Sequence, residues 1–173
     1  AESLDDLRGK LSKAKSMLAA IPQESQDSAG VYFSSRPLAH EGKIAFLFPG
    51  QGSQRVNMLR DLALAIPGCR QVLEKANAAI GGALGRSLTS FIYPHPKFTR
   101  EEQTADEQAL TQTHVAQPAI GAANLAMLWL LQRLGIRPQM AGGHSYGEYV
   151  ALHAAGVFDA DTLIRVSEAR GRW

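Results

Sequence analysis

The chain has 173 residues, 45% of them hydrophobic and 20% charged, and a net charge of +2. This length suits one domain with one core, and the scattered lysines and arginines exclude a concentrated nucleic-acid-binding surface. The single cysteine, Cys69, excludes an intramolecular disulfide, and no Cys or His group has zinc spacing, so we interpret Cys69 as a small helix residue.

The chain shows no targeting or membrane-spanning pattern. It opens with acidic and polar residues instead of the basic and apolar parts of a secretory signal. The longest apolar stretch, residues 119–131, contains Asn124 and is too short to cross a bilayer. We therefore expect a cytoplasmic location and no membrane partner.

The first 42 residues read as a linker or small accessory element. Ser3 is a candidate N-cap for an amphipathic helix that runs to Ile21, with leucines at helical spacing. A polar stretch follows over residues 22–30, then a short extended segment at 31–33 and a connector at 36–42. The main domain is expected from residue 43 to 173.

That domain begins at residues 43–48, Lys43 followed by five apolar residues without interruption, bounded by Pro49 and Gly50. Such a run predicts a strand buried on both faces of a parallel sheet. Helices are predicted over 56–66 and 69–80, a break over 81–85, and a polar, irregular excursion over 90–113.

The second half carries the most regular helix pattern. We predict a helix over 118–134, ended by Gly135 at the C′ position. A short strand at 139–143 follows, then a helix over 149–155 and a final helix capped by Asp159 or Asp161. This alternation predicts an α/β fold with a parallel sheet.

Ser145 stands in the sequence Gly143-His144-Ser145-Tyr146-Gly147, between the predicted strand and helix. This is the G-x-S-x-G pattern of a nucleophile elbow. A sharp turn forces strained backbone angles on the serine, and glycines on either side remove side chains that would collide. We predict that Ser145 is a nucleophile; an ordinary tight turn is the alternative.

An oxyanion hole is predicted beside this serine. The loop Pro49-Gly50-Gln51-Gly52-Ser53-Gln54 follows the first strand, so it should lie at the same carboxyl edge of the sheet. We expect the backbone N–H groups of Gln51 and Tyr146 to be the donor pair. A plain glycine-rich turn is the alternative interpretation of the loop.

No histidine is placed to act as the general base. His153 lies eight residues after Ser145 on the same helix, about 12 Å along the axis, and His144 should point to the other side of the strand end. The remaining histidines lie in connectors and are interpreted as surface residues: His40, His95 and His114. We therefore interpret the base as absent from this chain.

Arg170 is the other candidate site residue. It lies seven residues after Leu163 and four after Val166, in the apolar stripe of the last helix. A buried arginine needs an anion, because an unpaired buried charge costs several kcal/mol. The partner is either a protein carboxylate or the carboxylate of a substrate, which suits the guanidinium fork.

Three motifs together resemble the acyltransferase family that loads acyl carrier proteins. They are residues 48–54 (Phe-Pro-Gly-Gln-Gly-Ser-Gln), residues 143–148 (Gly-His-Ser-Tyr-Gly-Glu) and residues 168–171 (Glu-Ala-Arg-Gly). Gln117-Pro118-Ala119, Ala155-Gly156 and the interval from Ser145 to Arg170 also follow the family pattern. The family includes malonyl-CoA:acyl carrier protein transacylases and the acyltransferase domains of polyketide and fatty acid synthases, and the resemblance covers residues 42–173.

The resemblance implies a ping-pong mechanism. Ser145 would take a malonyl-type group from CoA, and the acyl-serine would pass it to the phosphopantetheine thiol of a carrier protein. Gln51 and Tyr146 would stabilise the oxyanion, and Arg170 would hold the free carboxylate. No cofactor or metal is implied for the domain itself, and the implied partners are an acyl-CoA, a carrier protein and the remainder of a synthase. Tyr146 and residues 31–43 look more like iterative enzymes, such as enediyne or polyunsaturated fatty acid synthases.

The main departure from the family is length. The resemblance implies an α/β-hydrolase-like large subdomain, followed by a histidine base and a ferredoxin-like small subdomain that would lie beyond Trp173. The chain is thus expected to be the N-terminal part of the catalytic domain and inactive alone. Two alternatives remain: a serine hydrolase, of α/β-hydrolase or patatin type, and a scaffold module without chemistry. The Gln51 loop and Arg170 favour acyl transfer.

Overall fold

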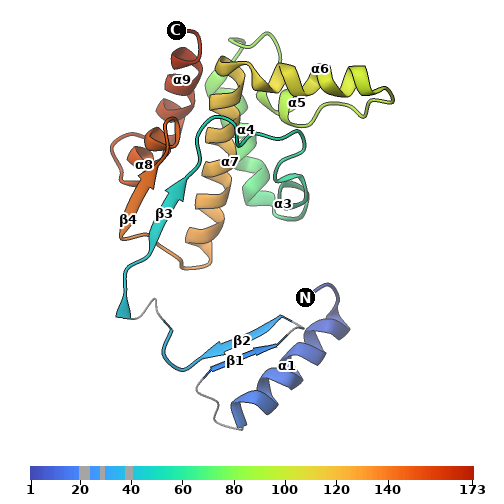
Figure 1. Cartoon of the computed structure of the whole chain (residues 1–173), viewed down its shortest axis with the longest axis vertical. Helices are drawn as coiled ribbons and strands as arrows, with labels where there is room; N and C mark the ends of the chain where they lie inside the picture. Colours follow the sequence, from blue (N-terminus) through green and yellow to red (C-terminus); the bar gives the residue numbers. More distant parts are fainter. Residues whose placement is uncertain (20–23, 28–29, 38–40) are drawn as a thin grey trace. The chain divides into compact units, whose positions relative to one another are not determined.

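The computed structural model describes residues 1–19, 24–27, 30–37 and 41–173. The chain forms two compact units, Ala1–Lys43 and Ile44–Trp173 (Figure 1). Among the described residues, each unit holds one two-stranded sheet, antiparallel in the first and parallel in the second.

The described residues of the first unit include a helix and a pair of antiparallel strands. Helix α1 spans Leu4–Ala19, and the Ser3 hydroxyl accepts a hydrogen bond from the Asp6 backbone N–H at 3.1 Å, so the predicted cap is confirmed. Strand β1 (Glu24–Asp27) pairs with β2 (Val31–Ser34). The extended segment at 31–33 is confirmed, but β1 was missed because its polar residues lack a strand pattern. The predicted end of the helix at Ile21 lies outside the described residues.

The second unit has helices around a short parallel pair of strands. Strands β3 (Ala45–Phe48) and β4 (Met140–Gly143) pair in register, with Phe48 opposite Gly143. The helices are α3 (Arg60–Ala65), α4 (Pro67–Ile80), α5 (Leu88–Ile92), α6 (Arg100–Thr111), α7 (Thr113–Arg133), α8 (Gly147–Ala154) and α9 (Ala160–Arg170). The predicted α/β class with a parallel sheet is confirmed.

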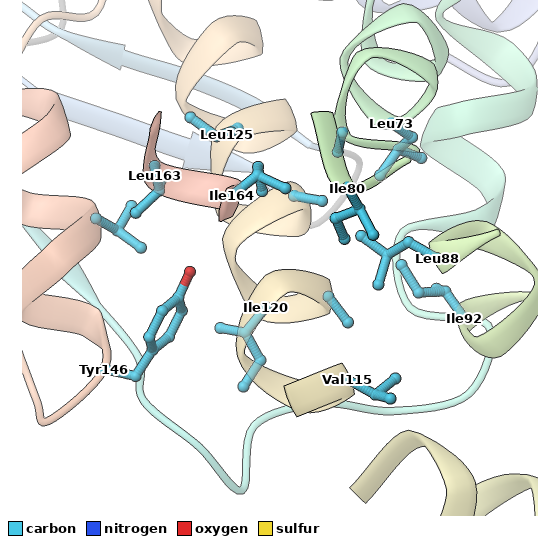
Figure 2. Packing of buried hydrophobic residues seen from close by; sticks show 14 of the residues in the cluster. Leu73, Ile80, Leu88, Ile92, Val115, Ile120, Leu125, Tyr146, Leu163 and Ile164 are labelled. Atoms are coloured by element: carbon cyan, nitrogen blue, oxygen red, sulfur yellow. The ribbon is translucent and has the colours of Figure 1, made fainter. Parts of the chain in front are cut away.

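Helix α7 is the centre of the core. It packs against α4 and α9 and also contacts α5, α6 and α8. Figure 2 shows side chains from α4, α5, α7, α9 and the elbow converging on one apolar cluster, which includes Leu73, Ile80, Leu88, Ile92, Val115, Ile120, Leu125, Tyr146, Leu163 and Ile164. This burial is the main favourable contribution to folding.

The length and apolar composition of α7 would allow it to cross a membrane, and no other helix in the described part of the chain meets that test. However, 61% of its most apolar window is buried inside the protein. The helix is longer than the apolar stretch 119–131 because it starts at Thr113. Its burial identifies it as a core helix.

The expected burial of the first strand on both faces is wrong for this chain. Phe48 is buried, but Leu47, which points to the opposite face, is 82% exposed. The Leu47 side chain lies beside Gly142 of the neighbouring strand, with its Cδ2 3.5 Å from the position that a Cβ would take there. A strand is buried on both faces only when elements cover both, and here the core lies on the Phe48 side.

Several helix boundaries differ from the predictions. The predicted helix 56–66 begins only at Arg60, because Asn57 and Leu59 have positive φ angles of 63° and 57° that a helix cannot contain. Helix α4 begins two residues early, with Pro67 in its first turn, where the missing N–H is not needed. Helix α7 begins five residues before the predicted start, so Pro118 lies inside it.

Residues 90–113 are not irregular. They contain the end of α5 and all of α6, so this prediction is wrong. A capping box starts α6: the Thr99 hydroxyl accepts from the Glu102 N–H, and the Glu102 carboxylate accepts from the Thr99 N–H. The Thr-x-x-Glu spacing was a visible signal for this helix.

The remaining turns agree with the sequence. Gly135 has φ 79° after α7, as a C′ glycine should. Asp159, rather than Asp161, caps α9 by accepting a hydrogen bond from the Thr162 N–H at 2.7 Å. Cys69 is buried in α4, where burial raises the pKa of its thiol.

Candidate active site

The turn between β4 and α8 has the geometry of a nucleophile elbow. Ser145 has φ 53°, in the left-handed region that a serine rarely adopts. A Cβ on Gly143 would collide with the backbone of Gly147, and a Cβ on Gly147 would collide with the Phe48 carbonyl. The two glycines therefore permit the close crossing of strand and helix that exposes the serine.

Ser145 is exposed, and its Oγ has no hydrogen-bond partner within the described part of the chain. It precedes α8, whose first-turn N–H groups give the elbow a positive electrostatic end. A hydroxyl in this position can be approached by a substrate, but nothing in residues 41–173 activates it by a direct bond.

The Gln51 loop lies against the elbow, at the carboxyl ends of both strands. The His144 N–H donates to the Phe48 carbonyl at 3.1 Å, and a Cβ on Gly50 would overlap the His144 carbonyl. The loop bends through Gly52, at φ 102°, and is closed by a bond from the Ser53 N–H to the Gly50 carbonyl. The structure thus brings the two predicted loops together.

The backbone N–H groups of Gln51 and Tyr146 donate to no protein acceptor among the described residues. Two free donors on adjacent loops, next to an exposed serine, are what an oxyanion would require. Their assignment as an oxyanion hole remains a prediction.

Gln117, the first residue of the Gln117-Pro118-Ala119 motif, is connected to the site through its side chain. Its side chain, 3% exposed, donates from Nε2 to Gln51 Oε1 at 3.4 Å. The Gln51 Nε2 donates in turn to Thr113 Oγ1 at 3.3 Å. The Gln117 Oε1 is buried without a partner. Two residues of α7 therefore hold the Gln51 side chain.

Arg170 ends α9, but its expected burial is wrong. The buried face of α9 consists of Leu163, Ile164 and Ser167, whereas Val166 is 37% exposed and Arg170 is exposed. Position 170 lies on the same side of the helix as Leu163, but it is further along the helix, beyond the edge of the core. The argument from a buried charge therefore fails.

The guanidinium of Arg170 lies 5.2 Å from the centre of the Tyr149 ring. None of the ion pairs found across the described ranges includes Arg170, so the alternative of a structural ion pair receives no support. An ion pair instead joins Glu168 of α9 to Arg172, which follows the helix. Arg170 is available to an external anion.

No histidine ring bonds to Ser145 in residues 41–173. His153 Nδ1 forms a hydrogen bond with the Phe158 carbonyl at 2.9 Å. His114, in the first turn of α7, packs with its backbone against Gly171, where a Cβ would collide with it. His40 lies outside the described residues. Within the same limits, no group of His, Cys, Asp and Glu side chains is arranged to hold a metal ion.

Comparison with known proteins places this chain among acyl transferases. The profile of the family described as "Acyl transferase domain" matches residues 45–172. The spectinabilin polyketide synthase system protein NorB of Streptomyces orinoci is 38% identical over 156 residues, which is 90% of this chain and 7% of that protein.

The malonyl CoA-acyl carrier protein transacylase of Escherichia coli K12 is 38% identical over 132 residues, covering 76% of this chain and 38% of the transacylase. Among solved structures, a malonyl transacylase in complex with a type II polyketide synthase acyl carrier protein matches with a TM-score of 0.63 and 38% identity. That match covers 76% of this chain and 38% of the other. The chain thus spans well under half the length of these relatives.

Proposed function

This chain belongs to the acyl transferase domain family, and we propose that its second unit is the N-terminal part of a domain that moves malonyl-type groups from CoA to an acyl carrier protein. The first unit, placed at residues 1–42 by the sequence, would be the linker that precedes this domain. The observation that carries the proposal is the exposed, strained Ser145 beside two free backbone donors.

In the first half-reaction, Ser145 Oγ would attack the thioester carbonyl of malonyl-CoA. The carbonyl oxygen would become a tetrahedral oxyanion, and the Gln51 and Tyr146 N–H groups, which donate to no described acceptor, would stabilise it. Collapse of the intermediate would form the malonyl ester of Ser145 and release the CoA thiol.

In the second half-reaction, the phosphopantetheine thiol of the carrier protein would attack this ester, and the malonyl group would leave as a new thioester. Ser145 must lose a proton in the first half and regain it in the second. Since no described histidine bonds to Ser145, we propose that the base comes from another part of the full-length protein.

Arg170 is the proposed ligand of the malonyl carboxylate. Its guanidinium is exposed, has no carboxylate partner in the described ranges and lies on the ring of Tyr149. A bidentate pair with the free carboxylate would favour malonyl over acetyl, which has no carboxylate. We further propose a cytoplasmic protein, with no metal or bound cofactor in this domain.

The proposal is tested with the full-length protein and radiolabelled malonyl-CoA, first alone and then with a holo carrier protein. Label should appear on Ser145, as located by peptide mass spectrometry, and then move to the carrier protein. A Ser145→Ala variant is the matched control and should take up no label. Rapid release of free malonate without transfer would instead identify a hydrolase, and absence of label on Ser145 would indicate a scaffold without chemistry.

The role of Arg170 needs its own variant. Arg170→Ala in the full-length protein should lower malonyl loading by roughly 10- to 100-fold, the value of one or two charge-assisted hydrogen bonds. Acetyl loading should change little, because acetyl has no group for Arg170 to hold. An equal loss with both substrates would show that Arg170 is structural.

A further inference from the structure

The side chain of Tyr146 lies in the hydrophobic core and not at the active site. Its backbone N–H is one of the two donors proposed above for the oxyanion, yet the residue is 0% exposed. Figure 2 shows the ring pointing away from the elbow toward Leu163 of α9 and the apolar cluster. Its hydroxyl fills the space beside Gly121 of α7, where a Cβ would overlap the phenol oxygen.

The phenol is bonded to the helix that carries Arg170. Tyr146 Oη lies 2.6 Å from Ser167 Oγ, and Ser167 Oγ donates its single proton to the Leu163 carbonyl, also at 2.6 Å. Tyr146 must therefore be the donor to Ser167. Burial raises the pKa of the phenol, so this proton stays in place over the physiological range.

Tyr146 is also connected to Arg170 through the ring of Tyr149. The rings of Tyr146 and Tyr149 are stacked, with centres 6.2 Å apart and planes 12° apart. Arg170 rests on Tyr149, 5.2 Å from the ring centre. Ser167 is also one helical turn before Arg170. Two separate contacts thus connect the residue after the nucleophile with the end of α9.

We infer that Tyr146 is a positioning residue for Arg170: its bond to Ser167 and its stack on Tyr149 set where the guanidinium stands relative to Ser145. The spacing between serine and guanidinium then selects acyl groups that carry a carboxylate at the matching distance. This inference rests on the proposed function, and it deepens that function by naming the residues that determine selectivity for the acyl chain.

The packing supports a fixed geometry more than simple filling of the core. A phenylalanine at 146 would fill the same apolar space, and Ser167 would remain satisfied through Leu163. The hydroxyl pair adds a directional bond between the elbow and α9, which apolar contact does not supply. Tyr149 is partly buried, and its ring contacts both the Tyr146 ring and the Arg170 guanidinium.

The test compares malonyl and acetyl loading of Ser145 in full-length variants Tyr146→Phe, Ser167→Ala and Tyr149→Leu. We expect the malonyl-to-acetyl ratio of kcat/KM to fall roughly tenfold in each, mainly through a higher KM for malonyl-CoA. Since Tyr146→Phe and Ser167→Ala break the same bond, the double variant should lose no more selectivity than either single one.

The matched control is Leu73→Val on α4, a core change at a position outside both loops of the site. It should lower thermal stability and leave the ratio unchanged. If Ser145 of the parent protein takes up no malonyl group, the proposed function itself fails. If the parent is labelled but the ratio stays within twofold in the three variants, or falls as far in Leu73→Val, the positioning role is overturned and the function stands.

Discussion

Helices α1 and α7 both carry apolar residues at helical spacing, yet they differ in burial in the structure. Helix α1 has no buried residue, and its leucines at positions 4, 7, 11 and 18 are between 42% and 74% exposed. Helix α7 buries eleven residues at the centre of its unit. Helical spacing of apolar residues therefore predicts a helix in both places, but whether the helix is buried depends on what surrounds it.

The difference also explains where a functional site can be built. The second unit has a core that can hold Ser145 in a strained turn and keep Gln117 and Tyr146 buried beside it. Local strain of about 1–3 kcal/mol persists only where surrounding packing determines the backbone. No comparable core supports the described residues of the first unit.

The largest expected effect comes from removing matched leucines in the two units. Leu163→Ala, at a side chain that is 0% exposed, should lower the free energy of unfolding by about 2–5 kcal/mol. Leu11→Ala, at a side chain that is 60% exposed, should change it by less than about 0.5 kcal/mol. Urea unfolding monitored by circular dichroism measures both. A large effect of Leu11→Ala would mean that the leucine face of α1 is covered in solution.

An intermediate effect is expected from the buried hydroxyl pair. Ser167→Ala leaves the Tyr146 phenol without an acceptor and should cost about 1–3 kcal/mol. Tyr146→Phe removes the donor while Ser167 keeps Leu163, and should cost about 1 kcal/mol. The order of the two melting temperatures is the readout. The reverse order would show that Ser167, rather than Tyr146, is the donor of the pair.

The smallest effect concerns pH and the start of α9. The Thr162 N–H bond holds the pKa of the Asp159 carboxyl below its ordinary value of 3.8. A carboxyl whose pKa is lowered in the folded state stabilises the protein at pH values above its pKa in the unfolded state. This stabilisation is lost as the pH falls through the pKa of the folded state. Asp159→Asn should therefore flatten the loss of stability below pH 3.8, measured by unfolding at a series of pH values.

The same comparison applies to Asp6 of α1, whose pKa is lowered chiefly by its hydrogen bond to Lys10. Asp6→Asn should change the helicity of residues 4–19 with pH and leave the main unfolding transition unaltered, because α1 buries no residue. A shift of the main transition by Asp6→Asn as large as that by Asp159→Asn would contradict the difference between the two helices.

Local signals predicted much of the second unit correctly. The glycines at 143 and 147 predicted the elbow because only a residue without a Cβ fits where strand and helix cross. The run at 43–48, apolar from Ile44 onward, predicted a strand, and Gly135 predicted the end of α7. Helix α6 was not predicted. The spacing of Thr99 and Glu102 indicates a capping box, but the polar composition of the segment also suits an irregular loop.

By itself the sequence determined which residues form the elbow, the Gln51 loop and the helices, since turn geometry, glycine spacing and apolar periodicity act between near neighbours. Only the tertiary structure decided which faces are buried. Leu47 lies in an apolar run and Arg170 lies in the apolar stripe of its helix, yet both are exposed. The Tyr146 ring, which belongs to the elbow, is buried in the core. The physical reason is that burial depends on residues far away in the chain, such as Gly121 and Ser167 for Tyr146, and a local pattern contains no record of them.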